Sequence, residues 1–176
     1  MLISSTIVWW CLLATLLFWS VGAYNRLVRL RSQASRAFAA VALQLQRYAE
    51  IIATNPSAPA TAGSPAWAGL HGALQQFTAS LSVARGKPLQ AAAIQALGAA
   101  DEVLQTAWQR VCTDAMDQDG SPLPPALLAQ WQDAGLQVQH ARNAFGHAVH
   151  TYNAAITQFP ARLLAWLFGF RIAKAL

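Results

Sequence analysis

The chain opens with an uncharged, strongly apolar stretch from Leu2 to Ala23, LISSTIVWWCLLATLLFWSVGA. At a rise of 1.5 Å per residue, about twenty helical residues cross a bilayer core of about 30 Å. A cleaved signal peptide is the alternative, because Val21-Gly22-Ala23 resembles a cleavage site. No Lys or Arg precedes the stretch, however, and it is longer than a signal-peptide core. We therefore expect an uncleaved transmembrane anchor over residues 1–23.

Positive charge follows the apolar stretch at once, with Arg26, Arg29, Arg31 and Arg36. Basic residues beside a membrane span stay on the cytoplasmic side. The sequence therefore predicts a single-pass integral membrane protein with its N-terminus outside and its body in the cytoplasm.

The basic charge as a whole is unevenly placed. Residues 24–47 hold five arginines and no acid, and residues 160–176 hold three cations and no acid, Arg162, Arg171 and Lys174. A high pI is typical of nucleic-acid binders. Here the positive charge lies in the two segments nearest the expected membrane, which fits anionic headgroups better, so we expect no nucleic-acid partner. The simplest interpretation is a positive-inside flank.

Composition predicts an all-α fold with one modest core. Of 176 residues, 55% are hydrophobic and only 11% are charged, and the part after the anchor is rich in the helix formers Ala, Leu and Gln. The two cysteines, Cys11 and Cys112, lie one in the anchor and one in the body, so we expect no internal disulfide.

Apolar residues recur every three or four positions in each of the segments between breakers, which indicates amphipathic helices. Their short connections favour antiparallel neighbours, so residues 24–159 are predicted to form an elongated bundle of about four helices. The first and fourth helices are the long ones, and Phe159 is expected to face inward. The first helix is expected to continue the anchor as one rod. The expected helices are 24–53, 66–85, 89–116 and 126–159, with breakers at 54–65, 86–88 and 117–125.

The last segment, residues 160–176, is apolar with basic flanks and is expected to form a short amphipathic helix, which Pro160 separates from the fourth helix. It is too short to span a bilayer and is suited to lying in the membrane interface. The alternative is that it packs back on the bundle or on a neighbouring subunit. We expect interface contact, because soluble proteins seldom expose such a large apolar patch.

Two segments resemble the LemA family. The opening segment holds Tyr24, Asn25, Leu27, Val28, Leu30 and Arg31, and the closing one holds Arg142, Phe145, Tyr152, Asn153, Phe159, Pro160, Phe168, Gly169 and Phe170. The resemblance implies a bacterial inner-membrane protein, an elongated antiparallel bundle, roles at the membrane envelope and no established catalytic activity. Residues 47–53 depart from the family by lacking its proline, and Gly135 and Gly146 stand where the family has an acid and an asparagine.

Few residues suggest chemistry. His140, His147 and His150 lie on one predicted helix, but a metal site needs further ligands, so a solvated polar stripe is the better interpretation. Asp101 and Glu102 are adjacent and point in different directions, which favours a solvated face. Cys112 stands beside Val111 and is expected to be a buried thiol. We expect no catalytic residue, metal or cofactor.

The Tyr-Asn pairs at 24–25 and 152–153 fall at one end of the expected bundle. Buried phenols and amides need hydrogen-bond partners. We hypothesise that these pairs form a polar latch that fixes the register of the two long helices, against the alternative of two unrelated helix ends.

The preferred function is non-enzymatic: a membrane-anchored helical scaffold that forms homo-oligomers or holds partners at the inner membrane. The alternative is an adapter or regulator of another membrane protein, such as a membrane-bound protease. An enzyme acting on a small-molecule substrate would need a site that the sequence does not offer.

Overall fold

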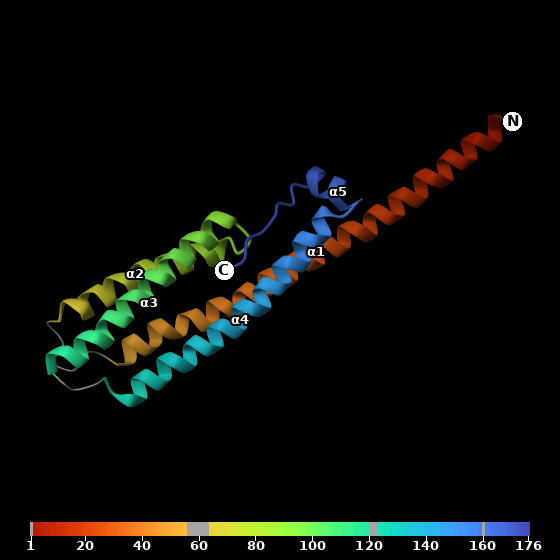
Figure 1. Ribbon diagram of the computed structural model, residues 1–176. Coiled ribbons are helices and arrows are strands. Elements are labelled where there is room, and N and C mark those ends of the chain that lie inside the picture. The colour runs from red at the N-terminus through yellow and green to blue at the C-terminus, as the bar shows by residue number, and fades with distance from the viewer. Residues whose placement is uncertain (1, 56–63, 120–122, 160) are drawn as a thin grey trace.

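The computed structural model describes residues 2–55, 64–119, 123–159 and 161–176, and within them every regular element is a helix (Figure 1). The all-α prediction is confirmed. The helices are α1 (Leu2–Thr54), α2 (Pro65–Gly86), α3 (Ala91–Asp119), α4 (Pro125–Thr157) and α5 (Ala161–Leu167).

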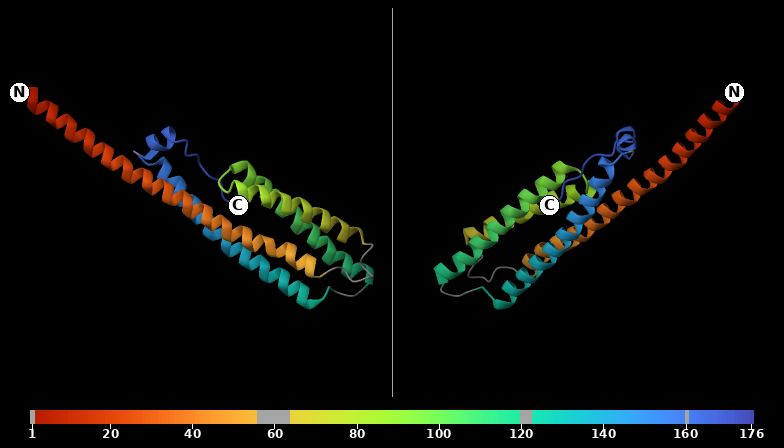
Figure 2. Two further views of the ribbon diagram at one scale, coloured as in Figure 1. Left: turned by 180° about the vertical axis from the view of Figure 1, so that it is seen from behind. Right: turned by 45° about the vertical axis from the view of Figure 1, so that its right-hand side comes forward.

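Helix α1 is one unbroken helix of 53 residues, so the predicted rod is confirmed. Its N-terminal part stands clear of the other helices, and its C-terminal part lies in the bundle (Figures 1 and 2). We call residues 9–23 the projecting segment. Its large apolar side chains are exposed, for example Trp10 at 70% and Phe18 at 85%. In the described part of the chain, α1 is the one helix long and apolar enough to cross a membrane.

The bundle is made of two antiparallel pairs, α1 with α4 and α2 with α3 (Figure 2). Each helix buries the stripe of apolar residues that the sequence spacing predicts. On α1 this stripe consists of Leu27, Leu30, Ala34, Phe38, Val41, Leu45, Tyr48 and Ile52. Phe38 meets Phe145 of α4 at 5.4 Å between ring centroids, which joins the first pair in the middle of the bundle.

Local sequence sets the helix ends. Ser64 caps α2 by accepting a hydrogen bond from the Ala66 N–H, and Pro65 fits the first turn because it needs no N–H partner. Helix α3 begins two residues later than predicted, because the Gln90 N–H donates to the Lys87 carbonyl and residues 87–90 form a turn.

Helix α4 ends at Thr157, earlier than predicted, and Gln158 is extended. Phe159 consequently leaves the helical stripe and is 81% exposed, so its expected inward position is wrong. The breaking role given to Pro160, and most of the loop between α1 and α2, lie outside the described residues.

The C-terminal segment is not a single amphipathic helix. Only Ala161–Leu167 is helical, and the chain then runs extended back over the bundle toward the turn between α2 and α3 (Figure 1). Part of the segment therefore packs on the bundle, which was the alternative interpretation, while α5 itself keeps Trp166 83% exposed.

Candidate functional site

The candidate site is the end of the bundle from which the projecting segment leaves. Here the opening and closing segments that resemble LemA come together. Leu27 and Leu30 are in the core and Tyr24 is 37% exposed. The remaining side chains of residues 24–31 are on the surface: Asn25, Arg26, Val28, Arg29 and Arg31.

Gly169 turns the chain at the end of α5. Its φ of +69° is in the left-handed region, which a side chain disfavours and glycine permits. The Phe170 N–H donates to the Ala165 carbonyl at 2.9 Å, and the Phe168 N–H donates to the Leu164 carbonyl at 2.9 Å. This is a glycine-terminated helix end of the Schellman type, and it places Phe168 and Phe170 on the same side as α1.

Tyr24 of α1 packs against both of these phenylalanines. Its ring centroid lies 4.9 Å from that of Phe168 and 6.1 Å from that of Phe170. About two helical turns after Tyr24 on α1, the Arg31 guanidinium lies 5.8 Å from the centre of the Phe170 ring. A cation over an aromatic face is attracted to it. The start and the end of the chain's body are thus joined by aromatic contacts.

Asn153 and Tyr152 hold the last residues of the chain. We call residues 171–176 the docked segment. The Asn153 amide donates to the Ala173 carbonyl at 2.8 Å and its oxygen accepts from the Ala173 N–H at 3.0 Å. The Tyr152 hydroxyl donates to the Arg171 carbonyl at 3.1 Å. Burial raises the pKa of Tyr152, and the charge of Arg31 offsets part of that rise.

The latch therefore has a different partner from the one hypothesised. Asn153 pairs with the main chain of Ala173, while Tyr24 packs on the phenylalanines and Asn25 is exposed. Ala173 is buried at 4% exposure. A methyl group placed at Gly146 would lie 4.0 Å from Ala175, and one at Gly98 would lie 3.9 Å from Leu176. The docked segment thus lies against both α4 and α3.

Asp101 is not on a solvated face, which corrects the expectation. It is 6% exposed and accepts a 2.8 Å hydrogen bond from the Arg142 guanidinium, which makes an ion pair between α3 and α4. The other oxygen of this carboxylate, Asp101 Oδ1, and the Nε of Arg142 are buried without a hydrogen-bond partner among the described residues. The spacing of apolar residues on α3 indicates this burial, because Asp101 falls in the same buried stripe as Leu97 and Leu104.

Aromatic side chains fill the opposite end of the bundle. The Trp131 ring stacks on Trp108 at 4.2 Å between centroids and lies 4.4 Å from the Tyr48 ring. Gly135 leaves room for the Tyr48 hydroxyl, which a methyl group there would meet at 3.5 Å. Burial raises the pKa of Tyr48 although a hydrogen bond with Gln105 lowers it. This cluster joins α1, α3 and α4 and is a structural feature.

The other candidates for chemistry are not brought together. His140, His147 and His150 are all exposed on α4. Cys112 is half-buried where full burial was expected, and desolvation raises the pKa of its thiol. In the part of the chain that the structure describes, no three His, Cys, Asp or Glu side chains are grouped as a metal site would need.

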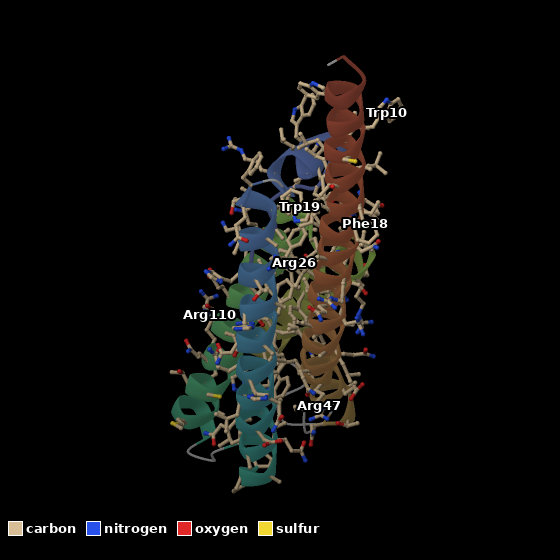
Figure 3. The ribbon with its side chains drawn as sticks, turned by 90° about the vertical axis from the view of Figure 1, so that its right-hand side faces the viewer. Trp10, Phe18, Trp19, Arg26, Arg47 and Arg110 are labelled. Carbon is tan, nitrogen blue, oxygen red and sulfur yellow. The ribbon has the colours of Figure 1, made fainter. Side chains whose placement is uncertain are left out.

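Exposed apolar side chains continue from the projecting segment onto α5. Leu163, Trp166 and Leu167 share one face of α5 and are 61%, 83% and 66% exposed. A groove of about 390 Å³ separates α1 from the end of α4, and Trp19 and Arg26 line it from the α1 side (Figure 3). The exposed cations Arg162 on α5 and Lys174 on the docked segment complete the predicted basic residues.

Comparison of the chain with protein-family models, with curated proteins and with solved structures gives no match.

Proposed function

We propose that this protein is a non-enzymatic scaffold of the bacterial inner membrane, of LemA type, anchored by the projecting segment and assembled into homo-oligomers. The part of α1 up to Ala23, which includes the projecting segment, crosses the bilayer once, with the N-terminus outside. The helical bundle stands in the cytoplasm, and α5 lies in the interface. The contacts that join Tyr24 to Phe168 and Phe170 support the family assignment, because they connect the two segments on which the resemblance rests.

One observation carries the membrane assignment: the projecting segment and α5 both keep large apolar side chains exposed, and α5 packs against α1. Monomeric soluble proteins rarely leave large contiguous apolar patches in water. Lipid or another copy of the chain would cover these side chains. The cations Arg26, Arg29 and Arg31 follow directly on α1, as expected for the cytoplasmic flank of a span.

Continuity of α1 favours a mechanical role. Because one helix serves as both the span and the longest element of the bundle, the bundle is held rigidly to the membrane. Bundles held in this way by neighbouring spans lie side by side, which favours association between copies.

An adapter for another membrane protein is the alternative, and a second surface favours it. A groove of about 830 Å³ lies between α2 and α3. Gly69 and Gly72 of α2 form one wall, and Glu102 and Arg110 of α3 form the other. A methyl group at Gly69 or Gly72 would meet no other atom within 4 Å, so the groove is open. Open small-residue surfaces permit a partner helix to approach closely.

A photo-crosslinking amino acid distinguishes the two roles in the full-length protein in its own cells. It is placed at Leu16 in the projecting segment, at Gly69 in the groove, and at exposed Asn143 of α4 as the control. The scaffold predicts crosslinks between copies of this chain at Leu16 and none at Asn143. A second protein captured at Gly69, without self-crosslinks at Leu16, would replace the scaffold with the adapter.

A further inference from the structure

Three cations from distant parts of the chain line one pocket. Arg31 comes from α1, Lys87 from the turn between α2 and α3, and Arg171 from the docked segment. The pocket has a volume of about 390 Å³, and Ser35 and Gln90 add polar groups to its wall. No acid lines it among the described residues. The sequence shows all three cations but gives no sign that they meet.

The three positive charges have no compensating partner in the described protein. The one ion pair there joins Arg142 to Asp101, in a different part of the bundle. Like charges that share a concave surface repel one another and raise the local potential, which attracts anions. The first turn of α3, which begins beside the pocket, also carries no acid, and the N-terminus of a helix adds positive potential.

An aromatic contact positions the Arg31 side chain, and hydrogen bonds position the main chain of Lys87 and of Arg171. Arg31 lies over the Phe170 ring. The Lys87 N–H donates to the Ala84 carbonyl and the Lys87 carbonyl accepts from the Gln90 N–H, both at 3.1 Å. The Arg171 carbonyl accepts the Tyr152 hydroxyl. The main chain of Lys87 and Arg171 is therefore fixed at the pocket, and the exposed side chains of the three cations extend from these fixed positions.

We propose that this pocket binds a phosphate-bearing anion, with Arg31, Lys87 and Arg171 contacting its oxygens. Guanidinium and ammonium groups form short, charge-assisted hydrogen bonds to phosphate oxygens, and several such groups are needed to surround one phosphate. The phosphate comes either from the headgroup of an anionic lipid or from a soluble phosphate compound.

The position of the pocket admits a lipid headgroup. Arg31 follows Ala23 by eight residues on an unbroken helix, about 12 Å along the axis at 1.5 Å per residue. Side chains on a helix lean toward its N-terminus, which on α1 is the direction of the projecting segment. The Cα–Cβ bond of Arg31 is thus tilted toward the proposed bilayer surface.

Binding of the anion is coupled to the docked segment, because that segment supplies Arg171. An anion that contacts all three cations stabilises the docked state, and release of the segment removes one wall of the pocket. Two sites coupled in this way affect each other equally. The pocket is thus a site that is complete only when the end of the chain is docked.

The test uses amide hydrogen exchange of the full-length protein in nanodiscs. One arm adds inorganic phosphate to nanodiscs of phosphatidylcholine, and the other includes phosphatidic acid in the nanodisc. The double variant Lys87→Gln/Arg171→Gln removes two of the three cations. The control Arg29→Gln/Lys174→Gln removes the same charge from α1 and the docked segment at exposed residues that do not line the pocket.

We expect slower exchange at residues 87–90 and 169–171 in at least one arm. Protection by inorganic phosphate identifies a soluble ligand, and protection by phosphatidic acid alone identifies a lipid headgroup. The pocket variant weakens the binding by about tenfold or more, since hydrogen bonds to charged groups are stronger than average. The control variant retains it.

A further variant, Asn153→Leu, keeps every charge but weakens the docking of the segment that carries Arg171, and we expect it to weaken the binding as well. Equal loss in the pocket and control variants would show that only total charge matters and would overturn the proposal. So would the absence of protection in both arms. Because the exposed cations contribute little to packing, helical content measured by circular dichroism is expected to stay unchanged in both charge variants.

Discussion

Replacing Asn153 by leucine is expected to weaken the docking of residues 171–176 while the long helices stay packed. The Asn153 amide makes both of its hydrogen bonds to Ala173, at 2.8 Å and 3.0 Å. Leucine has a similar size and can make neither. The Ala173 N–H and carbonyl, which are buried with that residue, would then be left without their partner in the docked state.

The magnitude follows from the two bonds. A typical intramolecular hydrogen bond contributes about 0.5–1.5 kcal/mol net, so their loss weakens docking by about 1–3 kcal/mol. A middle value of about 2 kcal/mol raises the population of the undocked segment about 30-fold. The change is local, because the Phe38–Phe145 contact and the core stripe of α1 lie outside the docked segment.

Amide hydrogen exchange measures this directly, because the Ala173 N–H itself donates to Asn153 Oδ1. Its exchange is expected to accelerate about 30-fold in Asn153→Leu, in proportion to the open population. Asn153→Asp keeps the acceptor for the Ala173 N–H but loses the donor to the Ala173 carbonyl. Its exchange rate at Ala173 is therefore expected to lie between those of the unaltered protein and of Asn153→Leu. Asn143→Leu, an exposed position on the same helix, is the matched control and leaves the exchange as it is.

Two results would refute this reasoning. If the Ala173 N–H exchanges at the same rate in Asn153→Leu and in the unaltered protein, the pair of bonds does not hold the segment. If exchange accelerates equally along all of α4, the substitution destabilises the bundle and the effect is not local.

Three further predictions concern other parts of the molecule. Asp101→Ala leaves Arg142 without its ion-pair partner and should lower the free energy of unfolding, measured by urea titration, by about 2–4 kcal/mol. The double variant Asp101→Leu/Arg142→Met should recover most of that loss. Equal losses in the single and double variants would contradict this. Gly146→Ala should stabilise the protein by about 0.5–1 kcal/mol, because alanine favours the helix and its methyl group would contact Ala175 at an ordinary 4.0 Å. A lower melting temperature would show instead that the new methyl group displaces the docked segment. In nanodiscs, a spin label in place of Trp166 should be more accessible to oxygen than to a water-soluble nickel complex. A label in place of the exposed Lys174 should show the reverse. Equal accessibility of the two labels to these reagents would place α5 outside the lipid.

Much of the fold could be predicted from the sequence because it depends on periodicity. The stripe that α1 buries, from Leu27 to Ile52, is the stripe that the spacing of apolar residues identifies. The sequence also marks the Tyr-Asn pair at residues 152–153 as a place where buried polar groups need partners, and both side chains are hydrogen-bonded. Its partner could not be identified, because Asn153 binds the main chain of Ala173, which no side-chain pattern marks.

Contacts between helices were harder to predict. Arg142 and Asp101 lie 41 positions apart, and their meeting depends on the register in which α3 faces α4. Sequence spacing fixes which face a residue occupies but not the height at which two helices meet. Asp101 could still have been recognised as buried from its place between Leu97 and Leu104. The return of the chain at Gly169 also had a signal, since a glycine after an apolar helical segment is typical of a helix end.

The most direct test of the scaffold is the mass and subunit composition of the full-length protein extracted in native nanodiscs. The scaffold predicts a particle that contains several copies of this chain and no second protein in fixed ratio. A particle with one copy, or one with a different protein in constant stoichiometry, would contradict it.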